Sequence, residues 1–83
     1  MKLWVKLYKN NKIVASHTAV SEYADAPEAL LDCVEQSCKK LDLAEPVFLS
    51  KHTRDLSVFR RTKLLPEDFM EPVTFDYCTL EIM

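Results

Sequence analysis

The chain has 83 residues, a formal net charge of −2 at pH 7 and no glycine. Without glycine the sequence cannot form a phosphate-cradling loop, a dinucleotide fingerprint or a nucleophile elbow, all of which depend on this residue. A chain of this length builds one core with little to spare for an enclosed substrate cavity, so we expect a single domain over residues 1–83 that holds no cofactor.

A β-hairpin is predicted at the start of the chain. Residues 2–9 alternate between apolar and polar or aromatic side chains, and a second strand-like run covers residues 12–20. Asn10 and Asn11 lie between these runs, and asparagine tolerates the left-handed backbone that a two-residue hairpin turn requires. The two strands are therefore expected to pair directly across this turn.

A helix is predicted from Ala26 to about Leu43. Asp25 is a candidate N-cap, Glu28 lies three residues on as in a capping box, and Pro27 is tolerated in the first turn. At 100° per residue one face collects mainly apolar side chains. These are Ala26, Leu30, Val34, Ser37 and Leu41.

The second half of the chain is predicted as short elements separated by proline-containing turns. They are a buried strand at 47–49, a helical turn capped by Ser50 or Thr53, an edge strand at 60–64, a turn of helix starting near Pro66 and a final strand over 75–83.

This order of elements predicts an α+β domain with one main helix covering one face of a sheet. The layout resembles the ubiquitin-like β-grasp fold, which implies a last strand inserted parallel beside the first. The chain ends in Leu80-Glu81-Ile82-Met83 without a Gly-Gly terminus, so the resemblance gives no support to conjugation. The alternative is a ferredoxin-like fold, which needs a second full helix within residues 50–70. The predicted core is Leu3, Val5, Leu7, Val14, Leu30, Val34, Cys38, Leu41, Phe48, Leu80 and Ile82.

A second resemblance concerns short stretches of sequence. They are Leu3-Trp4-Val5-Lys6, Phe59-Arg60-Arg61-Thr62, Phe69, Phe75-Asp76-Tyr77 and Leu80-Glu81-Ile82. Together they resemble a group of short uncharacterised proteins of Firmicutes-type bacteria. That group has no assigned activity, so the resemblance implies a bacterial origin and transfers no functional residue.

The predicted hairpin register makes one sheet face a candidate interaction surface. With Asn10-Asn11 at the tip, Tyr8 pairs with Ile13 and Trp4 with His17, all on the face opposite Leu3, and Tyr77 joins them if the last strand lies beside the first. Trp and Tyr are enriched at binding hot spots, and a contiguous apolar patch marks an interface. We expect a protein partner or a second copy there, with a homodimer as the first hypothesis. The alternative is that residues 50–74 fold back over this face. The predicted partner-binding residues are Trp4, Tyr8, Ile13, His17 and Tyr77.

A basic segment at residues 51–63 is the second candidate site. Arg54, Arg60, Arg61 and Lys63 surround Phe59, and cations gathered beside aromatic rings can bind phosphates and single-stranded bases. Nucleic-acid or phosphate-ligand binding is therefore the alternative function. The competing interpretation is a solvated loop, because acidic residues lie within and after the segment.

The cysteines and histidines do not predict a metal site or catalysis. Cys33 and Cys38 are about 140° apart around the predicted helix, and no second pair has zinc-ligand spacing. Three cysteines without a framework spacing are typical of buried free thiols in a reducing compartment. The opening residues alternate instead of forming a signal-peptide block, and no apolar run is long enough to cross a membrane. We expect a cytoplasmic, non-enzymatic protein that has no contact with membranes.

Overall fold

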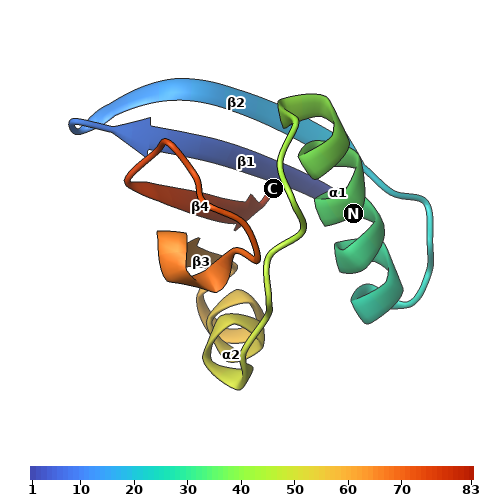
Figure 1. Ribbon diagram of the computed structural model, residues 1–83. Helices are drawn as coiled ribbons and strands as arrows, with labels where there is room; N and C mark the ends of the chain where they lie inside the picture. Colours follow the sequence, from blue (N-terminus) through green and yellow to red (C-terminus); the bar gives the residue numbers. More distant parts are fainter.

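The computed structural model describes residues 1–83 and shows an α+β fold, as the sequence predicts. Two strands are followed by two helices, a short strand, a single 3-10 turn and a last strand (Figure 1). The elements are β1 (Lys2–Lys9), β2 (Lys12–Val20), α1 (Ala26–Leu41), α2 (Ser50–Phe59), β3 (Arg61–Leu64), the 3-10 turn Pro66–Asp68 and β4 (Tyr77–Ile82).

The four strands form one sheet in the order β2-β1-β4-β3, and all neighbouring strands are antiparallel. The last strand lies beside the first, as expected, but it runs antiparallel to it and not parallel as the β-grasp resemblance implies. A direct loop over residues 65–76 joins β3 to β4, and a connection without a crossover helix favours an antiparallel pair. The direction of β4 is thus fixed by its pairing with β3.

The hairpin turn forms where the sequence predicts it. Asn10 and Asn11 have φ values of 54° and 62°, the left-handed values that a primed turn needs. The turn is also held from outside the hairpin, because the Asn10 backbone N–H donates to Asp76 Oδ2 at 2.8 Å. Two asparagines therefore replace the glycines that such a turn commonly contains.

A β-bulge changes the predicted register of the hairpin. Tyr8 pairs with Ile13 as expected, but Leu7 pairs with Ala15, so Val14 is an extra residue that opposes no partner. Val14 is 56% exposed and does not join the core. Beyond the bulge, His17 pairs with Val5 and not with Trp4.

The helices differ from the sequence prediction in two respects. The segment expected to form one helical turn is α2, a helix of 10 residues, and the strand expected at 47–49 is replaced by an isolated bridge between Pro46 and Phe69. A second full helix is what the ferredoxin-like alternative requires, but α2 follows α1 with no strand between them. At the start of α1, Asp25 is the N-cap residue but its side chain makes no capping hydrogen bond.

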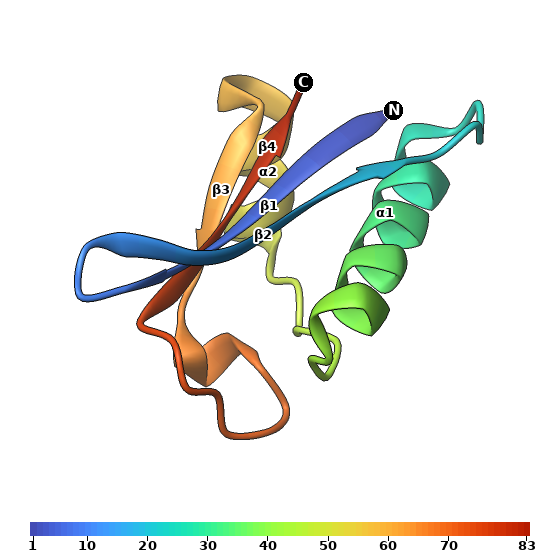
Figure 2. The same cartoon turned by 90° about the horizontal axis from the view of Figure 1, so that it is seen from above.

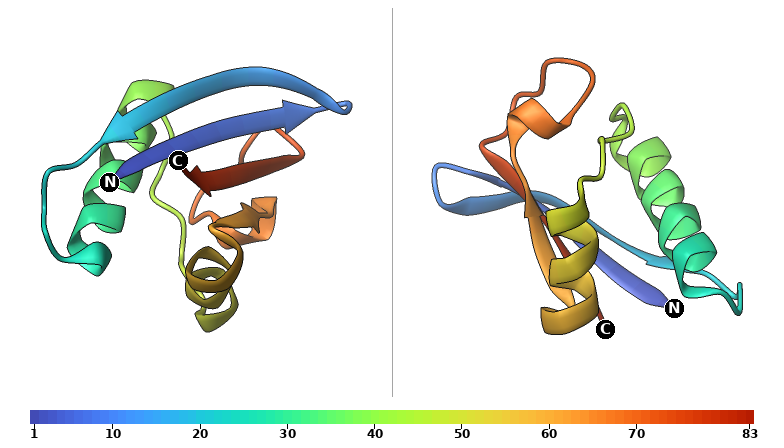
Figure 3. Two further views of the ribbon diagram at one scale, coloured as in Figure 1. Left: turned by 180° about the vertical axis from the view of Figure 1, so that it is seen from behind. Right: turned by 90° about the horizontal axis from the view of Figure 1, so that it is seen from below.

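Both helices lie on the same side of the sheet (Figures 2 and 3). One core joins the inward side chains of the sheet to α1, to Leu56 of α2 and to the aromatic pair Phe69 and Phe75. Of residues 50–74, β3 is an edge strand of the sheet, while α2 and Phe69 pack on the helix side and leave the opposite face uncovered. Of the predicted core, six residues are buried (Leu3, Val5, Leu7, Val34, Cys38, Leu80) and four pack against it partly buried (Leu30, Leu41, Phe48, Ile82).

Candidate binding site on the open sheet face

The face of the sheet turned away from the helices, here called the open face, carries a defined set of side chains. Cross-strand pairing places them in rows, because directly paired residues in an antiparallel sheet point to the same side. They are Lys2, Trp4, Lys6 and Tyr8 of β1, Ile13, Ser16, Thr18 and Val20 of β2, Arg61 and Lys63 of β3, and Tyr77, Thr79 and Glu81 of β4.

Four of the five predicted partner-binding residues share this face: Trp4, Tyr8, Ile13 and Tyr77. His17 does not. It pairs with Val5, whose side chain is 4% exposed in the core, so His17 lies on the helix side of β2. The physical reason is the bulge at Val14, which shifts the register by one residue and reverses the face of every later side chain.

Aromatic side chains and lysines pack against one another over the centre of the open face. The Tyr8 and Tyr77 rings stack with centroids 4.7 Å apart and planes 14° from parallel. Lys6 Nζ lies 3.9 Å from the centroid of the Trp4 ring, and Lys63 Nζ lies 4.5 Å from that of Tyr77. These cation–π contacts hold the lysines across the sheet instead of extended into solvent.

Positive charge dominates the open face although the whole chain is acidic. Four of the chain's 11 basic residues lie on this face: Lys2, Lys6, Arg61 and Lys63. Of the chain's 13 acidic residues, the face carries Glu81 alone. Glu81 Oε2 lies 3.8 Å from Lys6 Nζ and so offsets part of this charge. The remaining acidic residues are on the helices, loops and turns.

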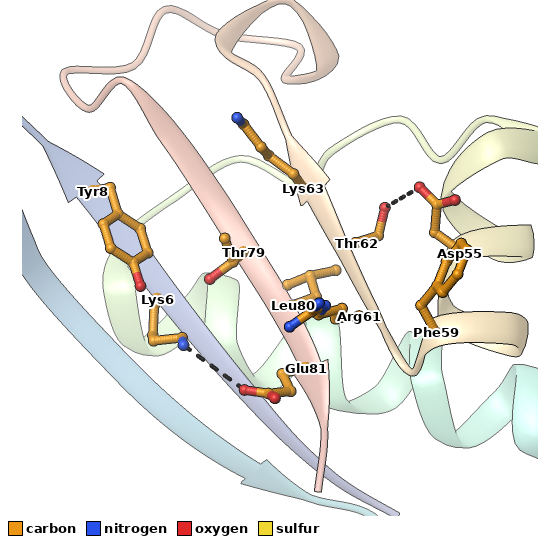
Figure 4. A pocket seen from close by; sticks show the side chains of 10 residues that line it. All are labelled: Lys6, Tyr8, Asp55, Phe59, Arg61, Thr62, Lys63, Thr79, Leu80 and Glu81. Carbon is orange, nitrogen blue, oxygen red and sulfur yellow. Dashed lines mark hydrogen bonds and ion pairs between the residues drawn. The ribbon is translucent and has the colours of Figure 1, made fainter. Parts of the chain in front are cut away.

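A shallow depression of about 640 Å³ covers the β3 side of the open face (Figure 4). Its floor is β4, where Thr79 pairs with Lys6 on one side and Lys63 on the other. The Thr79 Oγ1 atom is shielded from solvent and has no hydrogen-bond partner. Shielded hydroxyls are normally bonded. Ser37 Oγ on α1 is the other shielded hydroxyl without a partner, so Thr79 Oγ1 is the one on the open face. The lining residues are Lys6, Tyr8, Asp55, Phe59, Arg61, Thr62, Lys63, Thr79, Leu80 and Glu81.

The predicted basic segment is divided among three places. Arg61 and Lys63 lie on β3 and face the depression. Arg54 is exposed on α2, the helix that packs on the other side of the sheet. Arg60 is the C-cap of α2, with a left-handed φ of 62°. The structure thus brings only two of the four predicted phosphate-binding residues to the aromatic face.

His52 belongs to the core and not to a basic surface. It is 1% exposed, its Nδ1 accepts the Leu49 backbone N–H at 3.0 Å, and its Nε2 faces Asp68 Oδ2 at 3.5 Å. Asp68 Oδ2 also accepts the Leu65 N–H at 2.9 Å. These contacts attach the start of α2 to the 3-10 turn, which is a structural role.

The three free cysteines are buried, as the sequence predicts. Desolvation raises the pKa of Cys78 to about 12 and that of Cys38 to about 11, and the pKa of Cys33 is raised as well. The thiolate is the reactive form, so none of these thiols is activated as a nucleophile. No group of three or more His, Cys, Asp or Glu side chains is arranged to hold a metal ion.

The sequence interpretation missed Lys6 and Thr79 as parts of the candidate site. The alternation in residues 2–9 already places Lys6 beside Trp4 and Tyr8, and the final strand places Thr79 beside Tyr77. What the sequence lacks is the order of the strands, which puts β4 between β1 and β3 and so brings Thr79 between two lysines.

Comparison of the chain with family models, curated proteins and solved structures finds no match. The resemblance to short bacterial proteins therefore stays a prediction. None of the helices is both long and apolar enough to span a bilayer.

Proposed function

We propose that the chain is a non-enzymatic interaction module that binds its partner through the aromatic open face of its sheet. The observation that carries this proposal is the packing of α2 and Phe69 on the helix side, which leaves Trp4, Tyr8 and Tyr77 with no covering element. Aromatic side chains of this kind are the usual anchors of a binding surface. The raised pKa values of the buried thiols support a role without a cysteine nucleophile, and free thiols are consistent with a cytoplasmic location.

The charge of the open face favours a separate, anionic partner over a second copy of the chain. A homodimer formed through this face would bring together two surfaces that each carry four basic residues. Glu81 is the one acid there to pair with them. Like charges brought together across an interface cost several kcal/mol. The proposal therefore requires that a measurement of the mass in solution shows a monomer.

The second candidate function is binding of nucleic acid or of a phosphate-bearing ligand. The observation that favours it is the position of Arg61 and Lys63, which line the same depression as Lys6 and Tyr8. Two cations from the predicted basic segment are thus combined with the aromatic surface on one face.

Trp4 gives a direct test because it is the chain's one tryptophan. We expect its fluorescence to change when an acidic polymer, either poly-L-glutamate or a single-stranded oligonucleotide, is added, and to stay constant with poly-L-lysine. Tyr77→Ser on the open face should weaken this response. Tyr23→Ser should leave it unchanged, because Tyr23 is exposed on the connection between β2 and α1.

Light scattering at high micromolar concentration completes the test. We expect a monomer whose mass does not change with Trp4→Lys. A monomer whose Trp4 fluorescence responds to no anionic polymer would overturn the proposal, and a dimer broken by Trp4→Lys would replace the anionic partner with a second copy.

A further inference from the structure

We propose that the partner of the open face is a single-stranded nucleic acid, with one phosphate seated over Thr79 between Lys6 and Lys63. This inference rests on the proposed function of the open face as a binding surface and names the chemistry that it recognises.

Positive charge is concentrated on the open face of a chain that is acidic as a whole. The open face carries four basic residues against one acid although the chain as a whole has a net charge of −2. A surface of one sign attracts a partner of the opposite sign and orients its approach. The cations lie on two strands, β1 and β3, that are separated by β4, so a single small anion reaches only some of them, whereas a polyanion reaches them all.

Three paired residues, Lys6, Thr79 and Lys63, form a row across β1, β4 and β3. Directly paired side chains start about 5 Å apart at Cβ, so the ammonium groups of both lysines can reach an anion above the central threonine. Thr79 Oγ1–H has no acceptor in the protein, and a phosphate oxygen supplies one. Phosphate contacts of this kind from lysine and threonine are common in nucleic-acid complexes.

The ammonium groups of both lysines lie on aromatic rings of the open face when no ligand is bound. The Lys6 side chain is 14% exposed, lies on the Trp4 ring and touches Glu81, while the Lys63 ammonium lies on the Tyr77 ring. When both ammonium groups turn to a phosphate over Thr79, one face each of Trp4 and Tyr77 becomes free.

The aromatic rings lie on either side of the row formed by Lys6, Thr79 and Lys63. Trp4 lies in the next row toward one end of the strands, and Tyr8 and Tyr77 lie in the next row toward the other end. Residues two apart on a strand are about 6.7 Å apart, so bases on both sides of the seated phosphate can stack on the exposed ring faces. Such stacking contributes about 1–3 kcal/mol per base and requires no particular sequence.

The shape of the site selects a strand over other phosphate-bearing ligands. The depression of about 640 Å³ is open along the sheet (Figure 4), whereas small-ligand sites enclose most of their ligand. Reading a duplex requires an element that enters a groove, and the cations here lie on the sheet surface itself. An acidic peptide offers carboxylates to the lysines, whereas a nucleic-acid strand carries a flat base beside every phosphate and so supplies the cations and the rings together.

Glu81 acts as an internal competitor for the cations of this site. Its carboxylate lies 3.8 Å from Lys6 Nζ, and residue 81 is the cross-strand neighbour of Arg61. The other acid that lines the depression, Asp55, is engaged by the Thr62 hydroxyl at 3.2 Å. Removing the Glu81 charge should therefore release Lys6 and Arg61 to the strand and strengthen binding.

The experiment measures binding of a fluorescein-labelled 12-nucleotide oligothymidylate to the whole chain by anisotropy, with Trp4 quenching as the second signal. We expect Lys63→Gln to weaken binding about fivefold to tenfold and Glu81→Gln to strengthen it about fivefold. The slope of log affinity against log salt should fall by about 0.7 for each lost phosphate contact. Thr79→Val tests the hydroxyl without a change of charge and should weaken binding severalfold.

Lys51→Gln is the matched control, because Lys51 is an exposed lysine of α2 on the other side of the sheet. It should change the affinity less than twofold. If Lys51→Gln weakens binding as much as Lys63→Gln, the attraction is a general effect of net charge and the site is wrong.

Poly-L-glutamate of equal charge separates this inference from the proposed function. The oligothymidylate should bind at least tenfold more tightly than this polymer and than a DNA duplex of the same length. Equal binding of poly-L-glutamate would overturn the nucleic-acid inference and leave the open face as a binding surface for acidic proteins. Tighter binding of the duplex would also overturn it. If neither polymer binds, both proposals fail.

Discussion

His52 and Asp68 face each other in the interior, 16 positions apart in the chain, with His52 Nε2 3.5 Å from Asp68 Oδ2. Each also accepts a backbone N–H at the start of its own turn, from Leu49 and Leu65 respectively. His52 Nε2 is buried and has no hydrogen-bond partner, so the Asp68 carboxylate is its polar neighbour without a hydrogen bond between them. The pair therefore joins the first turn of α2 to the 3-10 turn by side chains alone.

The first prediction concerns the stability that this pair provides. Asp68→Ala leaves the Leu65 N–H without its acceptor and His52 Nε2 without its polar neighbour, and we expect it to lower the free energy of unfolding by about 1–3 kcal/mol. Urea unfolding measures the change. Asp68→Asn keeps an oxygen for Leu65 and should cost less, and Glu67→Ala, at the exposed neighbouring position, should cost under about 0.5 kcal/mol. Equal costs for Asp68→Ala and Glu67→Ala would show that the pair contributes nothing.

The same pair explains why the basic segment was only partly predictable from the sequence. In the sequence, His52 stands between lysine and arginine and looks like one more surface cation. Its burial depends on Asp68 and Phe48, which reach it only after the chain has folded. The helical spacing of Leu56 was visible, whereas the length of α2 depends on its packing against β3 and the core.

The open face shows a similar limit. The alternation in β1 was enough to place Trp4 and Tyr8 on one side. The position of His17 depends on a one-residue bulge in β2, and nothing in the local pattern requires it. One explanation for the bulge is that it brings the small side chain of Ala19 to the covered face, where it is 1% exposed, and turns Val20 outward. The direction of β4 depends on β3, a strand of four residues that is too short for its place in the sheet to be read from its sequence.

The second prediction uses the absence of glycine. Arg60 is the C-cap of α2 with a φ of 62°, a left-handed value that costs a residue with a Cβ about 1 kcal/mol or more. We expect Arg60→Gly to raise the free energy of unfolding by about 0.5–1 kcal/mol, since glycine is the usual residue at such helix ends. Arg61→Gly, one position later in β3, should lower it by a similar amount. Loss of stability in both variants, measured by urea unfolding, would contradict this account of the helix end.

The third prediction concerns stability at alkaline pH. The buried thiols of Cys38 and Cys78 have their pKa raised from 9.0 to about 11 and about 12. Above pH 9 the unfolded chain loses these protons while the folded chain keeps them, so the unfolded state binds fewer protons and stability falls as pH rises. This contribution is fully present below about pH 9 and is lost progressively between about pH 9 and 12.

Urea unfolding under reducing conditions at pH 7.5, 9 and 10.5 measures this loss. Cys78→Ala removes one of the thiols, so its stability should fall less steeply above pH 9 than that of the unchanged chain. The two proteins differ only at position 78, so the contributions of their common groups cancel in the comparison. Parallel curves for the two proteins would refute the assignment to Cys78.

The last prediction compares two threonines that lie in the same sheet and differ in their hydroxyl partners. Thr79 Oγ1 is shielded and unpaired on the open face, whereas the hydroxyl of Thr62, which is 6% exposed, donates to Asp55 at 3.2 Å. Thr79→Val removes an unsatisfied polar atom and should raise the free energy of unfolding by about 1 kcal/mol. Thr62→Val leaves Asp55 without its donor and should lower it by about 1–2 kcal/mol. If Thr79→Val both stabilises the fold and weakens oligonucleotide binding, the unpaired hydroxyl lowers the stability of the fold and contributes to binding the ligand. A loss of stability with Thr79→Val would instead show that the hydroxyl has a partner within the protein, and the phosphate position over Thr79 would lose its main support.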